Sequence, residues 1–186
     1  MLAIDLRPLT YQPHIRLALE EARDPYEDTA SQERKPSLLC PSVFRHGDLF
    51  ISQTSNVLMY LGPRLGLSDP RENEIYRVNA LALIALDGLS NMVHDTHHLI
   101  SQRRGLWLLG ESFTYADIYC LDGIQFAFPR ALNHARESGK YNSVFKLCKA
   151  VSARPDFATY MASDKRQKYT QGIYRYYEQN DVVAEG

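Results

Sequence analysis

Apolar and polar residues follow two different patterns along the chain, and the pattern changes near residue 62. Before that point, short apolar runs alternate with polar turns, which is typical of mixed strands and helices. After it, apolar residues recur three and four positions apart, as on the buried face of a helix. The sequence therefore predicts an α+β part over residues 1–62, an all-helical part over 68–178 and a polar tail over 179–186.

The first part is expected to contain a strand, then a helix, and then a short strand. Pro13 opens the helix, where its missing N–H costs nothing because first-turn amides have no partner within the helix. Apolar residues between positions 15 and 22 form the helix face, and Asp24 and Pro25 end it. Residues 26–29 have the composition of a short strand.

A hairpin and a second helix complete this part. The turn His46-Gly47-Asp48 separates Val43-Phe44 from the apolar run at 49–52. The helix runs from Gln53 to Leu61 and stops at Gly62-Pro63. A reduced thioredoxin-like domain needs the order strand, helix, strand, strand, helix, and residues 1–62 contain elements in that order.

The second part contains only helical patterns. Asp69 and Thr114 occupy helix-capping positions, and Pro70 follows the first of them at the first helical position. Thr114 and Asp117 form a capping box, in which the hydroxyl would bind the Asp117 N–H and the carboxylate would bind back, so we expect a structural role for both. The predicted helices cover residues 70–98, 115–128, 143–152 and 155–162.

Composition and charge exclude several classes of function. The 186 residues carry 21 basic and 22 acidic side chains, and this balance gives no sign of a nucleic-acid interface. No window approaches the ~18 apolar residues of a membrane span, and the N-terminus does not have the pattern of a secretory signal. The three widely spaced cysteines, Cys40, Cys120 and Cys148, favour a reducing compartment and buried thiols. We therefore expect a cytoplasmic protein.

Six blocks of the sequence carry further information: residues 15–22, 46–54, 94–98, 109–117, 126–129 and 172–177. These blocks resemble the cytosolic glutathione transferases, most closely a fungal branch. The resemblance covers most of the chain with gaps, and it implies a thioredoxin-like domain followed by an all-helical domain, shortened at the N-terminus and by one helix after residue 100.

The resemblance implies an anchor for the γ-glutamyl end of glutathione at the helix start Gln53-Thr54. A helix N-terminus offers N–H donors to a carboxylate, and Thr54 adds a hydroxyl. Gln53-Thr54 stands where the family usually has Gln-Ser. The alternative is that Thr54 or Ser55 only caps the helix.

Two further parts of a glutathione site follow from the resemblance. The backbone of Pro41, Ser42 and Val43 would clamp the cysteinyl residue, although Pro41 lies one position before the place of the family's cis-proline. Tyr11 or Thr10 would assist the sulfur, because they are the hydroxyl-bearing residues just before the first helix, where the resemblance places the sulfur. The alternative for Tyr11 is an ordinary packing role.

We expect no metal site, although His94 and His98 share a helical face, because the sequence shows no third ligand. The expected activity is conjugation of glutathione to a small electrophile through an activated thiolate, a detoxification reaction carried out by a homodimer without nucleic-acid or membrane partners. The alternative is a transferase-like binding or dimerisation module that has lost catalysis.

Overall fold

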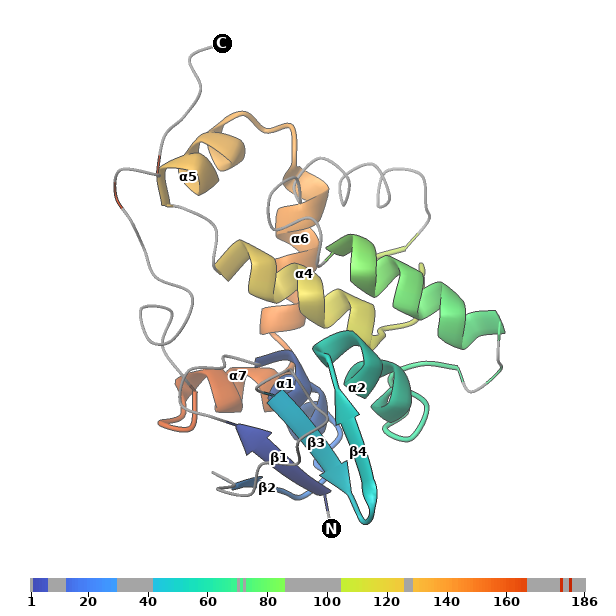
Figure 1. The fold of residues 1–186 in the computed structure, drawn as a ribbon. Coiled ribbons are helices and arrows are strands. Elements are labelled where there is room, and N and C mark those ends of the chain that lie inside the picture. Colours follow the sequence, from blue (N-terminus) through green and yellow to red (C-terminus); the bar gives the residue numbers. More distant parts are fainter. Residues whose placement is uncertain are drawn as a thin grey trace.

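A computed structural model places a small sheet beside a group of helices (Figure 1). It describes residues 2–6, 13–29, 42–69, 71, 73–85, 105–125, 129–166, 178 and 181. The sheet has four strands in the order β2-β1-β3-β4. These are β1 (Leu2–Leu6), β2 (Tyr26–Thr29), β3 (Ser42–His46) and β4 (Leu49–Ser52).

The pairing of the strands brings three chain segments to one edge of the sheet. β1 is parallel to β2 and antiparallel to β3, and β3 is antiparallel to β4. β1 and β4 therefore run in the same direction, so their carboxyl ends lie at the same edge. The register places Ser42 opposite Leu6 and Val43 opposite Ser52, so the start of β3 lies at this edge as well.

Two helices begin at this edge. α1 (Pro13–Glu21) connects the parallel strands β1 and β2 and runs back along the sheet, so that it starts near the end of β1. α2 (Thr54–Leu61) follows β4 almost directly. Both helices, the hairpin and the short strand β2 agree with the elements predicted from the sequence.

The helical part contains one helix that the sequence analysis missed. Residues 73–85 are helical, and the predicted continuation to residue 98 lies outside the described residues. Asp69 Oδ1 accepts the N–H of Arg71 at 2.9 Å, as expected of a capping residue. The helices that follow are α4 (Tyr115–Gln125), α5 (Pro129–Glu137), α6 (Asn142–Ser152) and α7 (Pro155–Ala162), of which α5 was not predicted.

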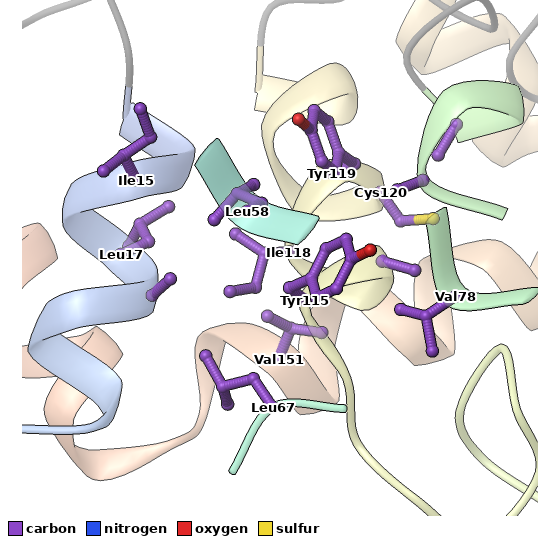
Figure 2. Close-up of a cluster of buried hydrophobic side chains, with 14 of the residues drawn as sticks. Ile15, Leu17, Leu58, Leu67, Val78, Tyr115, Ile118, Tyr119, Cys120 and Val151 are labelled. Carbon is purple, nitrogen blue, oxygen red and sulfur yellow. The ribbon is translucent and has the colours of Figure 1, made fainter. Parts of the chain in front are cut away.

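The hydrophobic core lies where α1 and α2 meet α4 and α6. Figure 2 shows Ile15 of α1, Leu58 of α2 and Ile118 of α4 pointing into one cluster. Val151 of α6 closes it, and each of these side chains is at most 1% exposed. Full burial of such a side chain contributes about 1.5–3 kcal/mol to the free energy of unfolding. This cluster therefore holds α1 and α2 against the helical part. Among the described residues, no helix combines the length and apolar character needed to cross a bilayer.

The start of α4 is organised by a carboxylate that is completely buried. Asp117 Oδ2 accepts the Thr114 N–H at 2.8 Å and the Thr114 hydroxyl at 3.2 Å, and its Oδ1 accepts the Leu108 N–H at 2.8 Å. The sequence analysis expected the Thr114 hydroxyl to bind the Asp117 N–H, but this N–H donates to the Thr114 carbonyl oxygen. Burial raises the pKa of Asp117 from 3.8 to about 6, although the three hydrogen bonds act in the opposite direction.

This pKa predicts a pH-dependent stability. Because the folded-state pKa lies above the unfolded one, the contribution of Asp117 to stability is complete below pH 3.8 and is lost as the pH rises through about 6. The loss amounts to roughly 3 kcal/mol at 1.36 kcal/mol per pKa unit. Urea unfolding of the wild type and of Asp117→Asn between pH 4 and pH 7 measures it. The difference in unfolding free energy between the two proteins should change across this interval, and parallel profiles would contradict the assignment.

Candidate functional site

The edge of the sheet where β1 and β4 end is the candidate site. The first turns of α1 and α2 lie there, and α4 packs against α1 and approaches α2 through Tyr119 and Ser55 (Figure 1). Ligands of open sheets bind outside the carboxyl ends of strands, where helix N-termini present unpaired N–H groups. The fold therefore creates a place for an anionic group at the start of α2.

Gln53 is held in a strained conformation at this place. Its φ of 69° and ψ of 122° lie in a region that non-glycine residues seldom adopt. Arg23 is the other non-glycine residue with positive φ among the described residues, and there it closes the end of α1, with Arg23 N–H bound to the Glu20 carbonyl oxygen and Asp24 N–H to that of Leu19. Gln53 has no such local reason, because its side chain is exposed and makes no capping hydrogen bond. Strain of this kind is typical of binding sites.

The first turn of α2 presents the predicted anchor. The first intrahelical hydrogen bond runs from the Val57 N–H to the Gln53 carbonyl oxygen at 3.0 Å, so the amides of Thr54, Ser55 and Asn56 precede the helical pattern of bonds. Thr54 and Ser55 are half-buried, with their hydroxyls at the same end of the helix. This turn combines N–H donors, two hydroxyls and the positive end of a helix dipole.

The predicted clamp lies beside this turn in part. Ser42 and Val43 begin β3, and the pairing of Val43 with Ser52 brings their backbone next to the strand that leads into Gln53. Pro41 lies outside the described residues. No described peptide bond is cis. The structure thus brings Ser42, Val43, Gln53 and Thr54 to one edge.

A contact between α1, α2 and α4 lies beside the candidate site. The ring of His14, the second residue of α1, stacks on Tyr119 of α4 with centroids 4.2 Å apart. The Tyr119 hydroxyl lies 3.5 Å from the hydroxyl of Ser55 on α2. Tyr119 is 1% exposed and His14 is half-buried, and burial lowers the pKa of His14 to about 3. His14 is therefore a neutral imidazole at physiological pH.

The remaining predicted groups fall outside the described residues. These are Tyr11, Thr10, His94 and His98, together with the expected loss of a helix after residue 100. Among the residues that the structure does describe, no group of three His, Cys, Asp or Glu side chains is arranged to hold a metal ion. Cys148 and Cys120 are buried as expected, and the Cys148 thiol donates to the Cys120 carbonyl oxygen at 3.3 Å.

Comparisons with known proteins agree with this fold. The family model of the glutathione S-transferase C-terminal domain matches residues 85–164. No curated protein matches the chain by sequence. Among solved structures, a glutathione S-transferase from Ascaris lumbricoides aligns with a TM-score of 0.69 at 17% identity, over 90% of this chain and 98% of that one.

Two other solved structures show the same likeness. A Nu-class glutathione S-transferase from Haemonchus contortus has a TM-score of 0.69 at 15% identity, over 91% of this chain and 100% of its own. Rat hPGDS, solved with a quinoline, also has a TM-score of 0.69, at 19% identity over 90% and 98% of the two chains. The chain has the glutathione transferase fold. The predicted α+β class, with a thioredoxin-like part before an all-helical part, is confirmed.

The sequence analysis of this transferase-like chain missed the contacts that the helical part makes beside the candidate site. His14 lay in a helix that was interpreted only by its apolar face, and Tyr119 in a capped helix whose role was taken as structural. Tyrosine and histidine at these positions interrupt otherwise apolar faces, which is the one signal the sequence offers. Their contact depends on how α4 packs, and no local pattern reports that.

The strain at Gln53 predicts a gain in stability on substitution by glycine. Gln53→Gly should raise the free energy of unfolding by about 1 kcal/mol, because glycine adopts positive φ without steric cost. Asn56→Gly is the matched control, since Asn56 is exposed within the same helix and should lose about 0.3 kcal/mol. Chemical denaturation measures both. A similar loss in the two variants would show that Gln53 is not strained.

Proposed function

We propose that the chain binds glutathione at this edge of the sheet and conjugates it to a small electrophile. The observation that carries the proposal is the arrangement of Gln53 and Thr54 at the start of α2, beside the first residues of β3. The γ-glutamyl carboxylate would accept hydrogen bonds from the first-turn N–H groups and the Thr54 hydroxyl. The matching of residues 85–164 to the transferase C-terminal domain, and the fold, support this proposal.

The remaining parts of the site follow from this orientation. The cysteinyl residue of glutathione would lie along the backbone of Ser42 and Val43, with Pro41 preceding it. Tyr11 or Thr10 would assist the thiol in losing its proton. The thiolate would then attack an electrophilic carbon, forming a sulfur–carbon bond while the leaving group departs with the electrons of the broken bond.

Several finer features remain predictions that accompany the proposal. They are membership of a fungal branch, the shortening of both parts, a role in detoxification and a cytoplasmic location. The rival function is a binding or dimerisation module without catalysis. Steady-state turnover of a panel of electrophiles by a preparation that binds glutathione distinguishes the two, since a module would bind and not turn over.

Retention on immobilised glutathione, with elution by free glutathione, tests the anchor. Thr54→Ala should weaken binding about tenfold or more, because a hydrogen bond to a charged group contributes about 1.5–3 kcal/mol. Thr54→Ser keeps the hydroxyl and should bind nearly as the wild type does. Thr159→Ala on α7 is the matched control, since Thr159 is exposed and its hydroxyl binds the Pro155 carbonyl oxygen. A folded wild type that is not retained would refute the proposed function.

The helix of residues 73–85 carries an exposed apolar stripe, which supports the expected homodimer. Tyr76, Leu83 and Ile84 are 59%, 40% and 38% exposed, and Ala80 lies between them at helical spacing. Exposed apolar stripes of this kind are typical of protein–protein contacts. We propose that two copies of the chain associate through this stripe.

Size-exclusion chromatography with light scattering tests the stripe. Leu83→Glu should convert the dimer to a monomer, because a charge in the centre of an apolar interface loses its hydration. Leu106→Glu is the control, since Leu106 is 43% exposed outside the helix that carries the stripe. A wild type that is monomeric, or a dimer unaffected by Leu83→Glu, would contradict the assignment.

A further inference from the structure

We propose that the chain has a second binding site, which takes a free α-amino acid with an apolar side chain. The site is a cavity of about 590 Å³ at the edge of the sheet opposite the candidate site. Asp24, which follows α1, and Leu61, the last residue of α2, both line it, so it lies between the ends of these helices. Its volume is usual for a small-molecule site. This function is separate from glutathione binding and does not depend on it.

The strand register determines where the two sides of this cavity lie. Leu2 of β1 pairs with Tyr26 of β2 and with His46 of β3, so these residues form one row across the sheet. The Tyr26 hydroxyl donates to Glu20 of α1 at 3.0 Å. On the other side, His46 Nδ1 lies 2.8 Å from the Tyr60 hydroxyl of α2. Both side chains therefore lie on the face of the sheet that the helices cover, with the cavity between them.

Tyr60 holds the basic side of the cavity in place. The guanidinium of Arg64 lies 3.7 Å from the centroid of the Tyr60 ring, and its Nη1 donates to the Tyr60 carbonyl oxygen at 2.7 Å. The Tyr60 ring packs in turn on Phe44, which is 1% exposed. Arg64 keeps N–H donors on its other nitrogens, and a planar fork of donors suits a carboxylate. Because packing already fixes this side chain, a ligand that binds it loses little of the binding free energy to ordering.

Asp24 and Glu27 form the acidic side of the cavity. Both line it together with Arg64, yet no ion pair joins Arg64 to either carboxylate or to any other in the part of the chain that the structure describes. The carboxyl ends of α1 and α2 add negative potential at this edge, which favours a positive group. The cavity thus holds opposite charges apart, and a ligand that carries both an ammonium and a carboxylate complements the two sides at once.

The remaining lining is apolar and determines the kind of side chain that the ligand carries. Leu61 is 1% exposed and Leu65 is half-buried, and Pro25 lies on the side of the carboxylates. Apolar surface between two charged groups favours a hydrophobic side chain on the carbon that bears them. The ligand class is therefore an α-amino acid such as L-leucine.

Isothermal titration calorimetry with L-leucine tests the site. Isocaproate keeps the carboxylate and the apolar chain without the ammonium, and isoamylamine keeps the ammonium without the carboxylate. The wild type should bind L-leucine about tenfold or more tightly than either probe, because each charged contact contributes about this factor.

Variants assign the two charged contacts. Arg64→Gln should weaken the binding of L-leucine about tenfold and leave that of isoamylamine unchanged. The double variant Asp24→Asn with Glu27→Gln should weaken L-leucine similarly and leave isocaproate unchanged. Arg45→Gln is the matched control, because Arg45 also lies over an aromatic ring and donates to a backbone carbonyl oxygen, but it does not line the cavity. It should bind L-leucine as the wild type does.

The outcomes separate this site from the proposed function. A folded wild type that does not bind L-leucine, or that binds all three probes alike, overturns the inference. Binding of L-leucine that neither Arg64→Gln nor the double variant weakens also overturns it, since the amino acid would then bind elsewhere. Melting curves show whether each variant is folded, and the double variant carries the test if Arg64→Gln is not. Arg64→Gln should be retained on immobilised glutathione as the wild type is, so the failure of this site leaves the proposed function standing.

Discussion

The buried carboxylate of Asp117 holds the start of α4, and the position of the candidate site depends on that helix. Its three hydrogen bonds join α4 to Thr114 and Leu108, so the segment before the helix cannot shift independently. Tyr115, the first residue of α4, donates its N–H to the carbonyl oxygen of Leu67 at 3.0 Å. Leu67 lies in the segment that connects the two parts of the chain, so the first turn of α4 also holds this connection in place.

The close approach of α4 to the end of α2 requires a glycine. A Cβ atom at Gly62 would lie 2.6 Å from Cδ1 of Tyr115, too close for any side chain without a shift of the ring. One turn further along α4, Tyr119 contacts α1 and α2 at their first turns. The same helix face thus fixes α2 at its end and at its beginning, and through α2 it fixes the orientation of Thr54.

A second set of contacts attaches the end of α1 to α7. Arg154 forms an ion pair with Glu21, whose side chain is 8% exposed, and its guanidinium lies 4.0 Å from the ring centroid of Phe113. The pair Arg23–Asp156 is exposed and contributes little by comparison. α1 is therefore held at both ends, by Tyr119 near its start and by Arg154 at its finish, so the helical part determines where His14 lies.

The sequence predicted the elements better than their contacts. α1, the hairpin, α2, α6 and α7 carry periodic apolar residues, and their predicted bounds agree with the structure within a few residues. α5 was missed because it carries few apolar residues, none of them buried, and because Pro129 was interpreted as the end of the preceding helix. Asp181 was assigned to a polar tail, yet it is completely buried and accepts the N–H groups of Arg130 and Ala131 at the start of α5.

The candidate site was predictable only in its local parts. The helix start at Thr54 follows from capping and turn residues, which are local signals. The positive φ of Gln53 and the contact of Tyr119 with His14 depend on packing between distant segments, and a single sequence does not encode them in a readable pattern.

A crystal structure of the chain with glutathione tests the central claim most directly. The account predicts that the γ-glutamyl carboxylate lies at the first turn of α2, within hydrogen-bond distance of the Thr54 N–H and hydroxyl, with the tripeptide following the backbone of Ser42 and Val43. Glutathione bound at another surface, or a chain that stays empty in crystals grown with saturating glutathione, would contradict it.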